Sequence, residues 1–276
     1  MNIERRVKET IKKYRMFSKK DKILVALSGG KDSTSILFIL KKLNYDVSGL
    51  MIDLYLGEWS KIHRKNMESF CKEFKIPFHL VDLRKEIGQG ICFIKSVLKR
   101  EKNLTGCTVC GITKRWILNK WAKKLKADVL VTGHNLDDEC QTILMNFLKG
   151  NIYLGINSHP ITGEKKVEGF VQRVKPFFFV PESEIKKYAL EKNFKILYDR
   201  CPCAIGTYRV ETRSWLKNIS DKEKKLIVKN WIKILPKLKK KKNLEFKKCK
   251  ICGDPSRGEI CRACEIFNVI NNIKNK

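Results

Sequence analysis

The sequence of 276 residues has no long hydrophobic run. Residues 1–20 are charged throughout and lack the apolar centre of a secretory signal peptide. No stretch approaches the roughly 18 to 20 apolar residues that cross a bilayer, so we expect no membrane association. Glycine and proline are also sparse, with 16 and 7 residues, while hydrophobic residues make up 43%. These proportions exclude a low-complexity chain and predict a globular protein with a buried core.

Acidic residues are scarce beside basic ones. The chain has 29 Asp and Glu against 59 Lys and Arg, which gives a formal net charge of +30. A surface this positive concentrates polyanions, and contacts with several phosphates make binding strongly dependent on salt. A single lysine run can also be a solvated helix face, but this reading has less weight for one run and much less for the whole excess, which favours a nucleic-acid partner.

Cysteine, in contrast, is abundant, with eleven residues. Because the sequence has no secretory signal, we expect a cytoplasmic location, where the thiols stay reduced. Paired cysteines in that compartment bind metal more often than they form structural disulfides. Most of the cysteines here occur in close pairs, which are Cys107/Cys110, Cys201/Cys203, Cys249/Cys252 and Cys261/Cys264.

Short apolar runs alternate with helical patterns over most of the chain. The runs predict strands at residues 22–27, 47–54, 78–83, 128–132 and 195–198. The helical patterns cover residues 4–17, 33–43, 61–74, 115–125, 137–148 and 181–192. This alternation predicts an α/β fold of Rossmann-like type, with helices on both faces of a parallel sheet. Ligands of such sheets bind beyond the carboxyl ends of the strands, where the turns at Ser28, Asp53 and Gly133 would meet.

The pattern changes twice along the chain, which predicts three parts. Residues 1–200 would form the catalytic α/β domain. Residues 201–246 would form a basic helical extension that includes the lysine-rich run at 237–242. Residues 247–276 would form a compact cysteine-based unit.

A glycine turn, SGGKDS at residues 28–33, joins the first strand to its helix. Two glycines allow a tight turn and a close approach to a ligand, and a helix N-terminus attracts anions. The segment is not a Walker A loop, because the upstream glycine is missing and Asp32 follows the lysine. It also differs from the GxGxxG fingerprint. An ordinary strand–helix turn would have the same glycine pair, so the anion cradle depends on the whole string.

The complete string resembles the PP-loop ATP pyrophosphatases, which have SGGxDS after their first strand and activate a carbonyl group by adenylation. The resemblance implies that Asp32 acts close to the phosphates of ATP through Mg²⁺. It also implies that Ile52 contacts the adenine side and that Gly133 lets the nucleotide approach the fourth strand. The implied nucleotide-site residues are Ala26, Leu27, Ser28, Gly29, Gly30, Lys31, Asp32, Ser33, Ile52, Lys114 and Gly133.

Three of the paired cysteines, Cys107, Cys110 and Cys201, predict an iron–sulfur site. Cys107 and Cys110 form a CxxC pair before a basic helix, and not directly after the first strand as in a thioredoxin-type motif. Cys201 precedes Pro202 after the last predicted strand. Three thiolates with one open position suit a [4Fe–4S] cluster. The role of Cys203 stays open here, because a fourth ligand would close that position.

This combination resembles the PP-loop enzymes that thiolate tRNA, a group that includes uridine-54, wobble-uridine and cytidine-32 enzymes. Their pattern is CxxC with a basic residue after it, then TGHNxDDxAQT, then a cysteine before proline. Here the middle element is TGHNLDDECQT at residues 132–142, where Cys140 replaces the usual alanine. The cluster ligands that the resemblance implies are Cys107, Cys110 and Cys201. The catalytic residues that it implies are Asp32, Lys114 and Asp138.

The last cysteines have the spacing CxxC-x8-CxxC, which is a strong signature of a structural zinc site with four thiolates in two knuckles. The predicted ligands are Cys249, Cys252, Cys261 and Cys264. This segment resembles the C-terminal zinc ribbon of the uridine-54 and wobble-uridine enzymes, which the cytidine-32 enzymes usually lack. The N-terminal zinc finger that is also usual in those enzymes has no counterpart in this sequence.

Together, the resemblances imply an ATP-dependent, [4Fe–4S]-dependent tRNA sulfurtransferase that converts a uridine to 2-thiouridine. The expected partners are tRNA and, as sulfur donor, a ubiquitin-like carrier or free sulfide, with a homodimer as a further expectation. Four alternatives stay open: a cytidine-32 thiolation enzyme, a ligase like tRNA-isoleucine lysidine synthetase, an amidotransferase of the same fold, and a non-catalytic zinc-ribbon RNA-binding protein. The three-cysteine set and the intact SGGKDS string favour the sulfurtransferase.

Overall fold

The computed structural model describes residues 2–102, 104, 106–156, 158–162, 167–199, 201–204, 208–240 and 246–274. Its centre is a six-stranded sheet in the order β3-β2-β1-β4-β6-β5. All neighbouring strands are parallel except β5, which pairs antiparallel with β6 at the edge. The strands are β1 (Ile23–Leu27), β2 (Val47–Asp53), β3 (Phe78–Asp82), β4 (Val129–Thr132), β5 (Ile161–Thr162) and β6 (Gln172–Val174).

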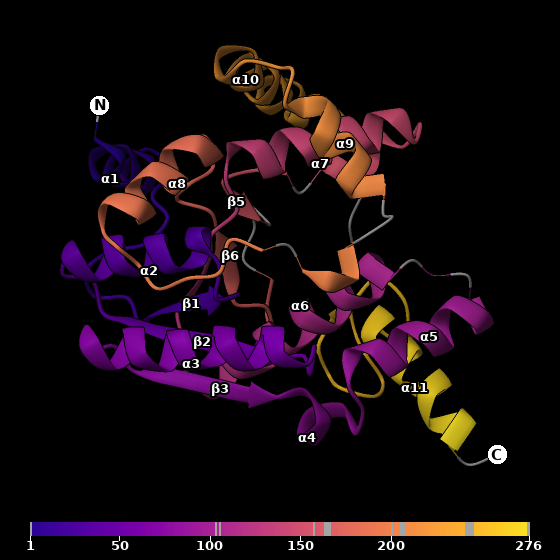
Figure 1. Ribbon diagram of the computed structural model, residues 1–276. Coiled ribbons are helices and arrows are strands. Elements are labelled where there is room, and N and C mark those ends of the chain that lie inside the picture. Colours follow the sequence, from indigo (N-terminus) through magenta and orange to yellow (C-terminus); the bar gives the residue numbers. More distant parts are fainter. Residues whose placement is uncertain are drawn as a thin grey trace.

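Helices cover both faces of the sheet (Figure 1). One face packs against α1 (Ile3–Tyr14), α2 (Lys31–Lys42), α3 (Glu58–Glu73) and α8 (Glu182–Glu191). The other face packs against α5 (Ile91–Lys102) and α6 (Gly106–Lys124), and the short α4 (Leu83–Ile87) follows β3. No helix in the described ranges is both long enough and apolar enough to span a bilayer.

The central strand β1 contributes to the core on both of its faces. Val25 and Leu27 pack with the helices of the first face, whereas Leu24 packs with those of the second. All three side chains are at most 6% exposed. Burial on both faces explains why the strand is a continuous apolar run in the sequence and not an alternating one.

A third group of helices, α7 (Leu136–Leu148), α9 (Tyr208–Leu216) and α10 (Asp221–Lys240), packs around its own apolar cluster. Both α9 and α10 contact α7. Figure 1 shows these three helices together at the top and upper right, above α5 and α6. The short helix η1 (Ile152–Gly155) closes this group, because Gly155 leaves room for the Trp231 ring.

The C-terminal unit packs on α5 and α6. It consists of the two-stranded sheet of β7 (Lys247–Lys248) and β8 (Pro255–Ser256), followed by α11 (Arg262–Lys274). Ile266 and Ile270 of α11 belong to the same core as α5 and α6. The ring of Phe267 meets the ring of Trp116 edge-on, with 5.0 Å between the centroids. The end of the chain therefore supports the helix that contains the CxxC motif.

The ends of β1 and β4 meet at the point where the connections change from one face of the sheet to the other, which is the usual ligand site of such sheets. Gly133, directly after β4, lies against the first turn of α2. A Cβ at this position would lie 2.8 Å from the carbonyl carbon of Asp32 and 2.9 Å from the nitrogen of Ser33. The close approach of these two segments therefore requires glycine.

The predicted architecture, a parallel sheet covered on both faces with a cysteine-based C-terminal unit, is confirmed. The strand predicted at residues 195–198 is wrong, because this segment joins no sheet and β6 occupies the place beside β4. Ile196 instead packs on the core without a strand partner. Helix α5 has no counterpart among the predicted elements. Helix α6 begins at Gly106 and so includes the CxxC motif.

Replacing Gly133 with alanine tests how closely β4 and α2 approach. The new methyl group would overlap backbone atoms that cannot rotate away, so we expect a loss of about 1–3 kcal/mol in the free energy of unfolding. Gly30→Ala is the matched control, since a Cβ there would meet only the Ser28 hydroxyl, at 3.6 Å. Urea unfolding followed by circular dichroism measures both variants. Wild-type stability of Gly133→Ala would contradict the close contact.

Candidate active site

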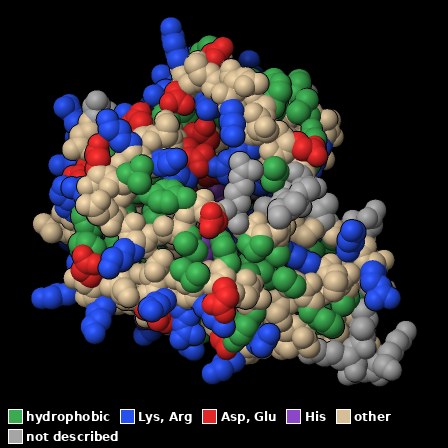
Figure 2. All heavy atoms as spheres, in the orientation of Figure 1, with side chains coloured by type: hydrophobic (Ala, Val, Ile, Leu, Met, Phe, Trp, Pro, Cys, Tyr) green, Lys and Arg blue, Asp and Glu red, His purple; other side chains and the backbone are tan. Residues whose placement is uncertain are grey.

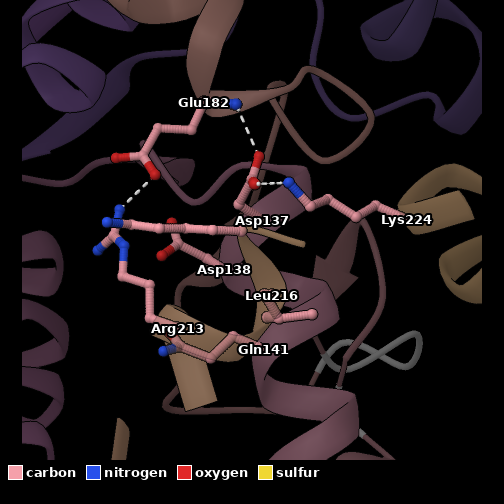
Figure 3. A pocket seen from close by; sticks show the side chains of 8 residues that line it. Asp137, Asp138, Gln141, Glu182, Arg213, Leu216 and Lys224 are labelled. Carbon is pink, nitrogen blue, oxygen red and sulfur yellow. Dashed lines mark hydrogen bonds and ion pairs between the residues drawn. The ribbon is translucent and has the colours of Figure 1, made fainter. Parts of the chain in front are cut away.

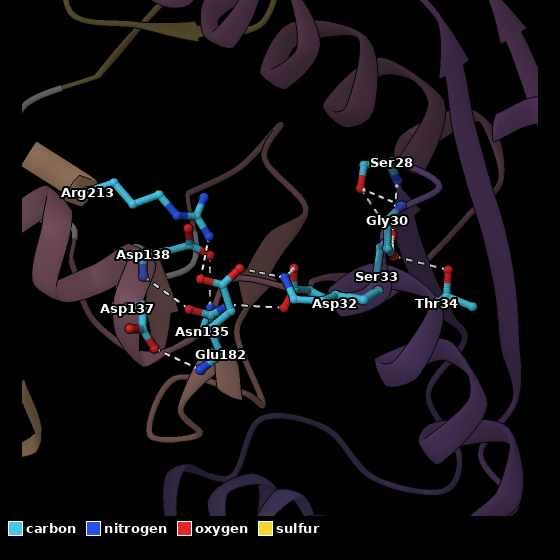
Figure 4. Close-up of polar contacts among 11 residues, drawn as sticks. Ser28, Gly30, Asp32, Ser33, Thr34, Asn135, Asp137, Asp138, Glu182 and Arg213 are labelled. Carbon is cyan, nitrogen blue, oxygen red and sulfur yellow. Dashed lines mark hydrogen bonds and ion pairs between the residues drawn. The ribbon is translucent and has the colours of Figure 1, made fainter. Parts of the chain in front are cut away.

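The turn after β1 forms an anion cradle at the N-terminus of α2 (Figure 4). The backbone N–H of Ser28 donates to the Ser33 hydroxyl oxygen at 3.1 Å, and the two hydroxyl oxygens lie 3.2 Å apart. Gly29 has a φ of +82°, and a Cβ there would lie 2.2 Å from the ring of His63. Gly30 caps α2 without a side-chain hydrogen bond. The first N–H groups of α2 are therefore available to an anion.

A line of alternating charges leads from the cradle to α8 and α9. The ammonium nitrogen of Lys31 lies 3.0 Å from a carboxylate oxygen of Asp32 and 2.6 Å from one of Glu182. The other carboxylate oxygen of Glu182 pairs with Arg213 of α9. Glu182 thus connects the beginning of the chain with the helical part near its end.

Asn135 joins the cradle to the first turn of α7. Its side-chain oxygen accepts from the Asp138 N–H at 3.1 Å, and the Asp138 carboxylate accepts from the Asn135 N–H at 3.2 Å. This reciprocal pair is a capping box. The Asn135 amide also donates to the Asp32 carboxylate at 3.0 Å. Asn135 is only 1% exposed, so one buried amide holds two carboxylates in place.

A cavity of about 70 Å³ lies beside Asp138 (Figure 3). Its wall is fixed by Asp137, which accepts from the Glu182 N–H and from the Lys224 ammonium group, both at 2.7 Å. Arg213 also lines this cavity. In Figure 2, acidic side chains lie inside a hollow that has lysine and arginine side chains around it. The strongly basic protein thus keeps a small acidic centre.

The carboxylates of this centre differ in their pKa values. Burial raises the pKa of Asp138 above the ordinary value of 3.8, although Arg213 opposes the shift. Burial also raises the pKa of Asp32, where Lys31 opposes the shift and the charge of Asp138 adds to it. Burial alone would raise the pKa of Glu182, but Lys31 and Arg213 outweigh it and lower that pKa. A divalent cation beside Asp32 and Asp138 would favour their charged forms.

The residues expected on the adenine side lie near the ends of β1 and β2, which pair in parallel. Ala26 and Ile52 are half-buried on the face that α5 and α6 cover. The side chain of Leu27 is buried in the core of the opposite face. Only the backbone of Leu27 is therefore free to meet a ligand at the end of the strand.

The thiols expected at the cluster lie around the beginning of α6. Cys107 and Cys110 occupy its first turns, and Cys201 directly precedes η2 (Pro202–Ala204), which packs against α6. The charge of Lys114, also on α6, acts on Cys201. The charge of Lys95 on α5 acts on both Cys110 and Cys201. The structure thus brings the late cysteine to the CxxC motif.

This donor set suits a polynuclear cluster better than a single ion. In the described part of the chain, only the four C-terminal cysteines have ligand atoms that all lie within 4.8 Å of one another. Cys107, Cys110 and Cys201 are spaced more widely, which fits ligands that bind separate irons of one cluster. All three are partly buried, free thiols. The nearby cations Lys95 and Lys114 would stabilise bound anionic sulfur.

The C-terminal thiols converge as their spacing predicts. Cys249, Cys252, Cys261 and Cys264 form the group with ligand atoms within 4.8 Å. The N–H of Cys261 donates to the Cys249 sulfur at 3.2 Å, and the N–H of Cys264 donates to the Cys261 sulfur at 3.5 Å. Four soft ligands with backbone N–H donors around them fit one tetrahedral metal ion.

Asn135, Glu182 and Arg213 belong to the site, but the sequence assigned them no role there. Asn135 lies inside the TGHN segment, and Glu182 was predicted only as part of a helix start. Arg213 is one of many basic residues after Cys201. The contact between Lys31 and Glu182 joins positions 151 residues apart, and no local spacing reveals such a pair. Only the acidic helix start after Pro181 gave a weak signal.

Comparisons with known proteins agree with this geometry. The sequence model of the PP-loop domain family matches residues 1–213. The chain is 34% identical to a tRNA-5-methyluridine(54) 2-sulfurtransferase from Pyrococcus horikoshii, over 99% of this chain and 87% of that protein. It is 30% identical to Cytoplasmic tRNA 2-thiolation protein 1 from Caenorhabditis elegans, over 98% of this chain and 73% of that protein.

A solved structure is also similar over most of its length. The U34-tRNA thiolase NcsA from Methanococcus maripaludis, with its [4Fe–4S] cluster, superposes with a TM-score of 0.80 at 26% identity. The match covers 96% of this chain and 86% of that one. The cradle and the family match define a PP-loop protein. Within that class, the chain belongs to the family of tRNA 2-thiolation sulfurtransferases.

Asp138→Asn should change how stability depends on pH. The raised pKa of Asp138 means that the folded protein binds this proton more readily than the unfolded chain. The contribution of Asp138 to the free energy of unfolding of the wild type is therefore most favourable at low pH, and it falls as the pH rises above about 4. The neutral asparagine removes that loss, so the variant should gain stability relative to the wild type between about pH 4 and pH 7. Thermal unfolding across this range measures the difference.

Asp137→Asn is the control for this experiment, because Asp137 forms an ion pair with Lys224 at 2.7 Å. Loss of that pair should lower stability at pH 7 instead of raising it. A difference between Asp138→Asn and the wild type that stays constant over the whole pH range would refute the burial effect.

Cys252→Ser should loosen α6 from a distance. Losing one of the four thiols would weaken metal binding at this group, and α11 would then pack less firmly on α6. We expect faster amide hydrogen exchange in α6 and unchanged exchange in α1. Lys250→Ala in the same unit is the control, because its ion pair with Glu259 is largely exposed. Wild-type exchange in α6 of Cys252→Ser would show that the unit gives no support.

Proposed function

We propose that the protein is a tRNA-uridine 2-sulfurtransferase that uses ATP to activate the C2 carbonyl of a uridine and replaces its oxygen with sulfur. One observation carries this proposal. An anion cradle, buried carboxylates and a separate set of thiols all lie on the side of the sheet where the parallel strands have their carboxyl ends. Relatives named for tRNA 2-thiolation support the choice of substrate. The name of one of them also supports a cytoplasmic location.

ATP overcomes a leaving-group problem. The uracil carbonyl oxygen is a poor leaving group, but after its attack on the α-phosphate it departs as part of AMP. We assign the phosphates to residues 28–33 and Mg²⁺ to Asp32 and Asp138, because a few carboxylates together with phosphates are the usual ligands of this ion. Lys31, held by Asp32 and Glu182, would offset the charge of the phosphates.

The remaining nucleotide contacts follow from the same arrangement. The adenine would lie near the ends of β1 and β2, against Ala26, the backbone of Leu27 and Ile52. Gly133 would border the nucleotide at the end of β4, in addition to its contact with α2. Lys114 would offset the charge that develops at the activated carbonyl and at the incoming sulfur.

Cys107, Cys110 and Cys201 would hold a [4Fe–4S] cluster, which supplies an open iron position for the sulfur that enters the reaction. Lys114 and Lys95, whose charges act on these thiols, would hold anionic sulfur there. Proximity of the sulfur and the activated carbon then replaces a collision in solution.

The basic surface and the C-terminal unit complete the proposal. The net charge of +30 favours contact with the tRNA backbone. The lysine-rich run at 237–242 would contribute to it, although residues 241 and 242 lie outside the described residues. The four C-terminal thiolates would bind Zn²⁺, the ion that prefers such a tetrahedral set.

Cys107→Ala should abolish 2-thiouridine formation and lower the iron content of protein purified without oxygen. The substitution removes one cluster ligand and leaves the cradle intact. Cys140→Ala is the matched control, because the Cys140 thiol is fully buried against α10 and lies outside both cysteine sets. Incubation with ATP, Mg²⁺, sulfide and tRNA, followed by mass spectrometry of the nucleosides, measures the yield.

Three outcomes would argue against the proposal. An unchanged thiouridine yield from Cys107→Ala would remove the role of the cluster. An iron-free wild-type protein that still releases pyrophosphate with tRNA would favour a ligase of the same fold. Binding of tRNA without any release of pyrophosphate would favour a non-catalytic RNA-binding protein.

A further inference from the structure

Two thiols lie together next to the three-cysteine set. The sulfur atoms of Cys92 and Cys203 are 3.9 Å apart. Cys92 lies on α5 and is exposed, whereas Cys203 lies in η2 and is partly buried. Cys201 is close enough for its charge to act on Cys92. Figure 1 shows α5 beside α6, and η2 packs against α6.

Lys95, one helical turn after Cys92, gives this pair a cation. The charge of its ammonium group acts on the Cys203 thiol as well as on Cys110 and Cys201. Its aliphatic stem packs against the beginning of α6, since a Cβ at Gly106 would lie 3.3 Å from the Lys95 Cδ. Because the stem is held in this way, the charge stays near Cys203 and Cys201 and attracts anionic sulfur there.

We propose that Cys92 and Cys203 form a sulfur-acceptor site, which takes the sulfane sulfur of a persulfide and releases it as hydrosulfide beside the three-cysteine set. The inference rests on the proposed function and names a class of sulfur donor for it. Cys92 is the first acceptor, because it is the more exposed of the two thiols. Cys203 acts second, because it lies next to Cys201 and Lys95.

The first step is a transfer of sulfane sulfur. The Cys92 thiolate attacks the terminal sulfur of the donor persulfide, a new S–S bond forms on Cys92, and the donor leaves as its thiolate. Sulfur moves without net oxidation, so this step needs no further reactant. The exposed position of Cys92 on α5 lets a donor that is itself a protein reach it.

The second step reduces the sulfane sulfur. The Cys203 thiolate attacks the sulfur atom of Cys92, and the bond to the terminal sulfur breaks. That sulfur leaves with the electron pair as hydrosulfide, while the two cysteines are oxidised to a disulfide. The separation of 3.9 Å is short enough for rotation of the two side chains to close the bond. A dithiol reductant in solution then restores both thiols by exchange.

The test compares two sulfur donors with the full-length, cluster-loaded protein. The donors are free sulfide and a low-molecular-weight persulfide, each supplied with ATP and tRNA. With one equivalent of the persulfide per enzyme and no dithiol, which keeps the released donor thiolate too scarce to reduce the protein, the wild type should make up to one thiouridine per enzyme. Peptide mapping should then find the Cys92–Cys203 disulfide. A thiouridine yield from the persulfide that leaves both thiols free would overturn the inference.

Single substitutions separate the two steps. Cys92→Ser should lose the persulfide-driven yield and keep the sulfide-driven yield. Cys203→Ser should stop at a Cys92 that is one sulfur atom heavier in the mass spectrum. Cys140→Ala, which changes a buried thiol, should behave as the wild type with both donors.

Two results would refute the sulfur-acceptor site. Loss of iron from Cys203→Ser, together with loss of sulfide-driven thiolation, would make Cys203 a fourth cluster ligand. A persulfide-driven yield from Cys92→Ser equal to that of the wild type would remove the acceptor. Failure of the wild type with both donors would instead contradict the proposed sulfurtransferase activity itself, so the two failures are distinguishable.

Discussion

The contact between the end of β4 and the first turn of α2 determines the rest of the site. Because Gly133 has no side chain, the backbone of β4 lies against Asp32 and Ser33. The next residues then reach the cradle, and the Asn135 amide bonds to Asp32 while it caps α7. The contact at Gly133, at the centre of the sheet, therefore positions the cradle, the acidic centre and the third group of helices together.

Charge is distributed unevenly between the surface and the site. The chain has about twice as many basic as acidic residues, yet several of its carboxylates gather at the N-termini of α2, α7 and α8. Glu182 stays charged because Lys31 and Arg213 pair with it, whereas burial disfavours the charge on Asp32 and Asp138. The basic exterior suits a polyanion, and the acidic interior suits a metal ion that brings phosphates with it.

The sequence predicted the fold where the physical signal was local. The apolar runs of β1 to β4, the glycine turn at residues 28–33 and the two-knuckle spacing of the last cysteines each depend on neighbours in the chain. The prediction failed at residues 195–198, where an apolar run packs on the core without a strand partner. The short strand β6 was missed because Gln172 and Arg173 give it no apolar pattern. Tertiary contacts, and not the local sequence, decide which of these short segments joins the sheet.

The same limit applies to the site. The cradle, Asp138 and the C-terminal ligands followed from motifs, since each motif keeps its residues within one turn or one knuckle. The partners of the motif residues did not follow from the sequence. Glu182 meets Lys31 of the cradle, and Lys95 meets the three-cysteine set, only because separate helices pack together. The packing of α11 on α6 adds an order of assembly. Because α11 begins about 150 residues after the CxxC motif, the cysteine-bearing helix gains this support only after the C-terminal unit has been synthesised and has docked onto it.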